Sequence, residues 1–221
     1  MLDTDREVIV SSICNERGES IERNVYFMTL SPENLRTLWE KSQHYHNLFG
    51  FEIEGNFERF ASLMFRGDEN SIAPTGLFWV VDDFVGLFYM TRIIPNVDAL
   101  VHYIFFDKIH KGREKLMEAM ILYAFETFNF KRISVELPDY ASGYAFNMIE
   151  DLGFNLEGCR QKASENKSGW HDVFLFGMTR ENFLNHTKAS LRQDSHKLGN
   201  LWRRIVEKVE RTKRIRELRG A

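Results

Sequence analysis

Cysteine and proline are scarce in this sequence, and long apolar runs are missing. The two cysteines, Cys14 and Cys159, lie far apart, so no disulfide framework is expected and both are interpreted as reduced packing residues. No run reaches the roughly 18 apolar residues of a membrane-spanning helix. The first ten residues, MLDTDREVIV, lack the basic and apolar segments of a secretory signal. We therefore expect a protein of the cytoplasm without a membrane span.

Internal repeats and low-complexity segments are also missing, and the composition is that of a folded chain. The 221 residues are 43% hydrophobic and include nineteen Phe, enough for a sizeable core. The length favours one domain with an appendage, which we place at 1–184 and 185–221. The net charge of −3 is uneven, because 188–221 hold eleven Lys/Arg against four Asp/Glu. Such a tail can bind polyanions, or dock on its own acidic body or on a second copy.

Hydrophobic periodicity and turn residues predict the elements of the first half. Strands are expected at 7–14 and 24–30, with a turn between them. A helix should begin at Pro32 behind Ser31 as its N-cap, and a second helix is expected at 56–65. After a polar loop, three further strands are predicted, at 77–81, 84–93 and 99–106.

The second half alternates between the two periodicities. It predicts helices at 112–128 and 141–152, and strands at 132–137, 154–160 and 172–180. This order implies an α+β fold, with a mixed and mostly antiparallel sheet, one parallel crossover and helices on both faces. An amphipathic basic helix should follow near Gly199. It can pack on the body or on a partner copy, contact nucleic acid, or lie on a membrane surface.

The stretch from Val101 to Phe154 carries the main functional signal. An apolar strand leads into a basic turn that contains glycine, then into a helix, a second strand and a second helix ending at Gly153. Free N–H groups at a helix start beside an open strand end suit a phosphate-bearing cofactor. A solvated basic turn without a ligand is the alternative.

These segments resemble the GNAT superfamily of acyl-CoA-dependent N-acyltransferases, in particular the branch that modifies ribosomal proteins and polyamines. Three segments carry the resemblance, which extends over about 24–183. They are the turn His110-Lys111-Gly112-Arg113 with its helix, the segment AFNMIEDLGF at 145–154, and the closing hairpin from GWHD at 169–172 to MTRE at 178–181.

The resemblance implies that the pantetheine of an acyl-CoA lies between splayed parallel strands at 100–106 and 133–137. The pyrophosphate would lie on the N–H groups of 110–115. The cofactor-binding residues so implied are Ile104, Phe105, Phe106, His110, Lys111, Gly112, Arg113, Glu114, Lys115 and Ser142.

Four positions depart from the family pattern. Lys111 and Arg113 stand where glycines are usual, so they can crowd the phosphate or add charge to its site. Ser142 replaces the usual Asn at the start of the second helix. Ile149 stands where members often carry a tyrosine that protonates the leaving thiolate. Another group or water would have to take that role.

The implied chemistry is direct attack of an amine on a thioester. His102 is the candidate base and Tyr103, on the opposite face of the strand, is the alternative. A half-buried, hydrogen-bonded structural histidine is an equally good interpretation of His102. Backbone N–H groups at 104–106 can polarise the carbonyl. The segment His44-Tyr45-His46 lacks flanking ligands, so no metal is expected.

Two functions follow from this reading. The first is an N-acetyltransferase that uses acetyl-CoA on an amine acceptor, whether a protein, a polyamine or another small amine. Acidic residues Glu33, Glu40, Glu52 and Glu54 can line the path of a cationic acceptor. The second is an inactive GNAT-fold binding protein whose tail at 188–221 contacts nucleic acid or an assembly partner. A homodimer is compatible with both.

Overall fold

The structure is a computed structural model of the whole chain, and it describes residues 7–14, 20–43, 55–68, 71–106 and 113–193. A central sheet of eight strands forms the frame, with strand order β1-β2-β5-β6-β7-β8-β10-β9. Its strands are β1 (Glu7–Cys14), β2 (Ser20–Phe27), β5 (Gly76–Val81), β6 (Gly86–Ile94), β7 (Asp98–Phe105), β8 (Arg132–Pro138), β9 (Asn155–Asn166) and β10 (Gly169–Thr179). Within the described residues, no helix is both long and apolar enough to cross a membrane.

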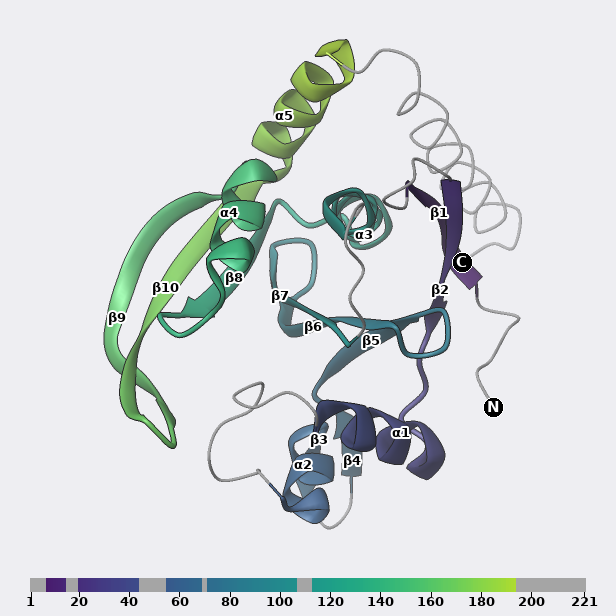
Figure 1. Cartoon of the computed structure of the whole chain (residues 1–221), viewed down its shortest axis with the longest axis vertical. Coiled ribbons are helices and arrows are strands. Elements are labelled where there is room, and N and C mark those ends of the chain that lie inside the picture. Colours follow the sequence, from purple (N-terminus) through teal and green to yellow (C-terminus); the bar gives the residue numbers. More distant parts are fainter. Residues whose placement is uncertain (1–6, 15–19, 44–54, 69–70, 107–112, 194–221) are drawn as a thin grey trace.

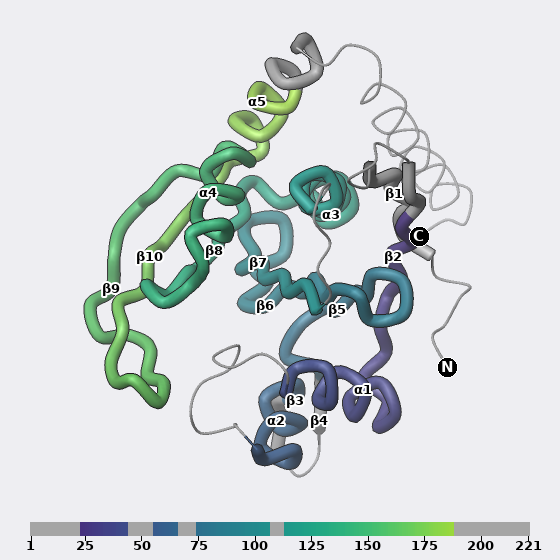
Figure 2. Tube along the Cα trace, in the orientation of Figure 1, coloured from purple at the N-terminus to yellow at the C-terminus, as the bar shows by residue number. Residues whose placement is uncertain are grey.

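One parallel pair interrupts the antiparallel sheet. The chain leaves β7, passes through the long helix α3 (Arg113–Phe128) and returns as β8 (Figure 2). Strands β7 and β8 are in register at a single position, Leu100 opposite Ser134, whereas β6 and β7 pair along most of their length. The two parallel strands therefore separate after that contact, toward their carboxyl ends.

Helices cover both faces of the sheet, and each face has its own core (Figure 1). Helices α1 (Pro32–Ser42) and α2 (Phe57–Leu63) pack on one face with side chains such as Leu38, Phe60 and Phe78. Helix α3 packs on the other face together with α4 (Gly143–Asp151) and the start of α5 (Arg180–Gln193). The predicted α+β class, with a mixed sheet and helices on both faces, is confirmed.

Local sequence signals set where these helices begin. Ser31 caps α1 through a hydrogen bond from the Asn34 N–H to its Oγ (3.2 Å), and Pro32 follows as the first helical residue. Asn56 caps α2 in the same manner, accepting from Arg59 N at 3.0 Å. Caps of this kind satisfy N–H groups that the helix itself leaves free.

Several boundaries differ from the sequence prediction. The polar loop before 77 contains a short hairpin, β3 (Phe65–Asp68) with β4 (Ser71–Pro74), so the prediction of loop was wrong there. Strand β9 extends to Asn166 and β10 begins at Gly169, whereas the sequence predicted an end at 160 and a start at 172. Polar residues continue the strand pairing there on an exposed edge. Helix α5 starts at Arg180 and passes through the proposed boundary at 184/185. The predicted basic helix near Gly199 lies outside the described residues.

Helix α5 packs on the turn that ends α4. Gly153 has φ +88°, and a Cβ there would lie 3.0 Å from the ring of His186 on α5. The His186 Nε2 also lies 2.8 Å from the carbonyl oxygen of Asp151, near the end of α4. Glycine is therefore required at 153 by conformation and by the approach of α5.

Replacing Gly153 with alanine is expected to destabilise the fold by about 1–2 kcal/mol, since the new Cβ meets both a positive φ and the His186 ring. Gly143→Ala is the matched control: that glycine lies in the first turn of α4 with nothing within 4 Å of an added Cβ. The control is expected to be neutral or to stabilise by up to about 1 kcal/mol. Urea unfolding measures both, and equal effects would contradict the packing of α5 on Gly153.

Candidate functional site

The separation of β7 from β8 leaves backbone donors without strand partners. The Phe106 N–H donates to the Val85 carbonyl at 2.8 Å, on the β6 side. Because donors alternate along an antiparallel strand, the N–H of Ile104 also faces β6, while those of Tyr103 and Phe105 face β8. Past Leu100 and Ser134 no register pair joins β7 to β8 along the full described length of both strands. Two N–H groups thus open into the widening gap.

His102 and Tyr103 point to opposite faces of β7, as the sequence predicted. The His102 ring stacks on Tyr89, with centroids 4.4 Å apart and planes 9° apart, on the face that α1 and α2 cover. Tyr103 packs against the core under α3 and α4 and lies 6.0 Å from the Phe105 ring. The two candidates therefore serve opposite sides of the same gap.

His102 is a neutral imidazole near pH 7. Its Nε2 lies 3.0 Å from the Thr91 Oγ1, which fixes the ring in place. Burial lowers the pKa of His102 to about 4, with Glu136 raising it and Arg92 lowering it further. Such a group can hold a hydrogen bond but is a weak acceptor for a full proton.

A three-residue ion chain crosses the sheet beside His102. Glu136 on β8 accepts from Arg92 Nη1 at 2.6 Å and from Arg160 Nη2 at 2.5 Å, through separate carboxylate oxygens. The guanidiniums come from β6 and β9, so the chain ties three strands together across the gap. Two positive charges against one negative charge leave this edge of the site with a surplus of about +1.

On the opposite face, aromatic and charged side chains gather at the first turns of α3 and α4. The Arg113 guanidinium lies over the Phe105 ring (5.3 Å) and over the Tyr144 ring (5.4 Å). The Tyr144 hydroxyl donates to Glu114 Oε1 at 2.6 Å, which joins α4 to α3. Two buried polar atoms here, the Tyr103 hydroxyl oxygen and Arg113 Nε, have no hydrogen-bond partner within the described part of the chain.

Several of the other predicted cofactor residues have contacts within the protein away from this cluster. The Ser142 Oγ accepts the Ala145 N–H at 3.2 Å as the N-cap of α4, and Lys115 Nζ pairs with Glu118 at 3.6 Å. Phe106 is buried in the core under α1 and α2. His110, Lys111 and Gly112 lie outside the described residues. Of the implied cofactor set, Phe105, Arg113 and Glu114 therefore lie together at the start of α3, beside the catalytic candidate Tyr103.

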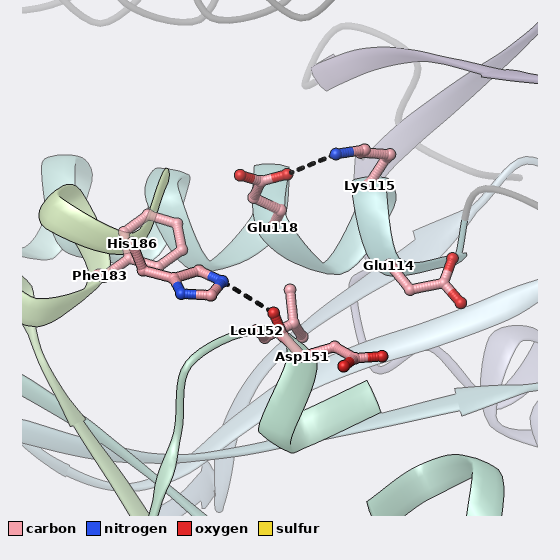
Figure 3. Close-up of a pocket in the computed structure, with 7 residues that line it drawn as sticks. All are labelled: Glu114, Lys115, Glu118, Asp151, Leu152, Phe183 and His186. Atoms are coloured by element: carbon pink, nitrogen blue, oxygen red, sulfur yellow. Dashed lines mark hydrogen bonds and ion pairs between the residues drawn. The ribbon is translucent and has the colours of Figure 1, made fainter. Parts of the chain in front are cut away.

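A cavity of about 170 Å³ lies beside this cluster, between α3, α4 and α5 (Figure 3). Its lining carries three carboxylates against one ammonium and one imidazole; the lining residues are Glu114, Lys115, Glu118, Asp151, Leu152, Phe183 and His186. The acidic lining does not suit a phosphate. The negative charge of a phosphate is attracted instead to the Arg113 guanidinium at the start of α3.

A second polar cluster fastens the tip of the β9–β10 hairpin to the end of β8. His171 Nδ1 lies 2.6 Å from Asp139 Oδ1, and its Nε2 lies 2.8 Å from Ser168 Oγ. These are the distances of a Ser-His-Asp triad. However, Asn166 Oδ1 accepts the Ser168 N–H and lies 2.9 Å from Nε2, so Nε2 must donate. A donating nitrogen cannot take the proton of Ser168, and the cluster is structural.

Two features of the structure were not predicted from the sequence. The hydrogen bond from the Tyr144 hydroxyl to Glu114 depends on the packing of α4 beside α3, which no local pattern predicts. Cys159 is exposed on β9, so its interpretation as a packing residue was wrong. No group of three or more His, Cys, Asp or Glu side chains is placed to hold a metal ion in the described ranges.

Several solved structures that are similar to this chain are acetyltransferases. RimJ from Mycobacterium smegmatis in complex with CoA-disulfide has a TM-score of 0.59 at 15% identity, covering 82% of this chain and 93% of that one. Mutant forms of the spermidine/spermine N-acetyltransferase SpeG from Vibrio cholerae give 0.58 at 17%, covering 74% and 98%. The ribosomal-protein-S18-alanine N-acetyltransferase from Escherichia coli gives 0.52 at 14%, covering 70% and 93%.

The chain thus has the GNAT fold, and the resemblance seen in the sequence is confirmed. No family model matches the sequence, and no curated protein does. At such low identity the likeness shows the fold alone, so the activity has to be argued from the site.

The buried His102 is expected to make stability depend on pH. The folded pKa of about 4 lies below the unfolded value near 6.5, so the unfolded chain binds the extra proton first. The contribution is present above about pH 6.5 and is lost as the pH falls toward 4, by on the order of 3 kcal/mol.

Urea unfolding between pH 7 and pH 4 measures this dependence in the wild type and in His102→Gln. The glutamine can keep a bond to Thr91 but does not titrate, so its curve should be flatter in that window. Parallel curves would show that His102 is not held neutral by burial.

Proposed function

We propose that the protein transfers an acyl group, by default acetyl, from acyl-CoA to an amine by direct attack in a ternary complex. The observation that carries this proposal is the single register contact between β7 and β8. Beyond it the strands open, with the N–H groups of Tyr103 and Phe105 directed into the gap. Donors of this kind can bind a pantetheine amide or a thioester carbonyl.

The residues at the gap fit a CoA-type co-substrate. Arg113, at the start of α3, supplies a positive charge where the helix N-terminus adds about half a charge of the same sign. The Tyr103 hydroxyl and Arg113 Nε, which have no hydrogen-bond partner among the described residues, gain one if a polar ligand enters. The RimJ structure with CoA-disulfide supports the same cofactor class for this fold. Acyl-CoA supplies an activated acyl carbon and a thiolate leaving group.

His102 would orient the amine rather than remove its proton. With a pKa of about 4, the imidazole cannot compete for the proton of an ammonium group. The amine must therefore arrive neutral. At pH 7.5 about a third of an α-amino group is neutral, but only about one in a thousand of a lysine-like amine.

The charges near His102 favour the same acceptor class. Arg92 and Arg160 outnumber Glu136, so this edge of the gap repels a polycation. Of the acidic residues considered for an acceptor path, Glu33 and Glu40 lie on the exposed face of α1, and Glu52 and Glu54 lie outside the described residues. We therefore propose an α-amine, such as a peptide N-terminus, before a polyamine.

Acetyl transfer to a peptide with a free α-amine and to spermidine, at equal concentration, tests this order. The peptide is expected to react faster, with a rate that rises with pH along the pKa of its α-amine. A faster reaction with spermidine would contradict the acceptor class. Failure of acetyl-CoA to bind at millimolar concentration in calorimetry would contradict the enzyme itself.

The alternative is an inactive binding protein, and one observation favours it. Ile149, where the family often has its tyrosine, is fully buried in the core, so α4 presents no proton donor at that position. In this case the basic tail would contact nucleic acid or an assembly partner. The domain division at 184/185 remains a proposal, because α5 runs on to Gln193 and Thr187 is buried.

Truncation after Gln193 is expected to abolish salt-dependent binding of RNA or DNA if the tail is the contact, since it removes nine Lys/Arg and four Asp/Glu, a net of five positive charges, and leaves α5 whole. Unchanged affinity for RNA or DNA without the tail would contradict this contact.

A further inference from the structure

We infer that the Tyr103 hydroxyl stabilises the departing thiolate by a hydrogen bond and keeps its own proton, in place of the acid that Ile149 cannot be. This inference rests on the proposed function, because it requires a CoA thioester in the gap between β7 and β8. Tyr103 would thus act as a hydrogen-bond donor to the leaving group, whereas the sequence suggested it as an alternative base.

The position of Tyr103 suits this role. It lies three residues past Leu100, the last residue of β7 in register with β8, so its backbone borders the open part of the gap. Its ring turns toward α3 and α4, and the residues that influence its ionisation are Arg113, Glu114 and Tyr144 in the first turns of those helices. The neighbouring Phe105 ring, with its centroid 6.0 Å from that of Tyr103, lies under the Arg113 guanidinium, so Tyr103 lies near the start of α3.

The Tyr103 hydroxyl is also available. Its oxygen is buried, and none of the described residues bonds to it. The neighbouring hydroxyl of Tyr144 is committed to Glu114 at 2.6 Å. A buried hydroxyl without a partner is unfavourable, and a ligand atom that accepts its hydrogen relieves this cost.

Burial raises the pKa of Tyr103, with smaller effects from Tyr144 and Glu114 in the same direction and from Arg113 in the opposite one. The phenol therefore stays protonated over the working range and holds its proton more tightly than a thiol, whose pKa is about 8.5. It can donate a hydrogen bond to sulfur, but full transfer of the proton would be uphill.

The reaction balances without an acid. The amine nitrogen forms a bond to the acyl carbon, the carbon–sulfur bond breaks, and its electron pair goes to sulfur. The proton that the amine loses leaves through water and reaches the thiolate by the same route. Tyr103 starts and ends as a neutral phenol, and Ile149 remains a core residue with no part in the step.

The first test concerns the protein without ligand. In Tyr103→Phe the ring stays and the only group lost is the hydroxyl, for which the described part of the chain offers no hydrogen-bond partner, so the melting temperature should be unchanged or higher. A clear fall in melting temperature would show that the hydroxyl has a partner within the protein, and would overturn the inference.

The second test compares coenzyme A with desulfo-coenzyme A, which lacks the sulfur. Calorimetry on the full chain from pH 7 to 9.5 gives the ratio of their affinities. In the wild type the ratio should rise by roughly tenfold in favour of coenzyme A as its thiol ionises, because Tyr103 binds the thiolate. Ionisation of any protein group acts on both ligands and cancels in the ratio.

Tyr103→Phe should lose this rise, while Tyr140→Phe should keep it, since the Tyr140 hydroxyl lies near Ser164 (3.4 Å) on the hairpin. A rise that persists in Tyr103→Phe, or that is missing in the wild type, would overturn the role of Tyr103 and leave the cofactor site standing. If neither ligand binds to the wild type, the proposed function fails and this inference fails with it.

Discussion

The parting of β7 from β8 is the constraint on which the rest of the site depends. A parallel pair held at Leu100 and Ser134 alone leaves N–H groups of β7 without a strand partner, and free donors inside a fold call for another partner. The long helix α3, which lies between the two strands in the chain and packs into the core, allows β8 to return parallel to β7. The ion chain through Glu136 then ties β6, β8 and β9 together across the opening.

The two faces of β7 divide the chemistry. On one face His102 is stacked on Tyr89, bonded to Thr91 and kept neutral by burial, so it suits an amine that arrives without its proton. On the other face Tyr103 lies near Arg113, Tyr144 and Glu114 at the helix starts, where a cofactor would approach. The departures from the GNAT pattern become intelligible in this arrangement. Arg113 packs between aromatic rings, and Ile149 fills the core.

Sequence reasoning reached the fold because the signals it uses are local. Ser31-Pro32 and the apolar spacing of 113–128 depend on neighbouring residues, and both gave the correct elements. It failed where the structure depends on contacts that no local pattern shows. These are the hairpin at 65–74, the full length of the β9–β10 pairing, and the hydrogen bond from Tyr144 to Glu114. Strand alternation placed His102 and Tyr103 on opposite faces. The burial that shifts their pKa values depends on tertiary packing, which no local sequence pattern shows.

Amide hydrogen exchange with and without acetyl-CoA tests the central claim most directly, because it reports on the gap itself. If the cofactor lies between β7 and β8, the N–H groups of Tyr103 and Phe105 and those at the start of α3 should gain protection, while the β5–β6 hairpin stays unchanged. Protection confined to the acidic cavity between α3, α4 and α5, or no change on β7, would contradict the account.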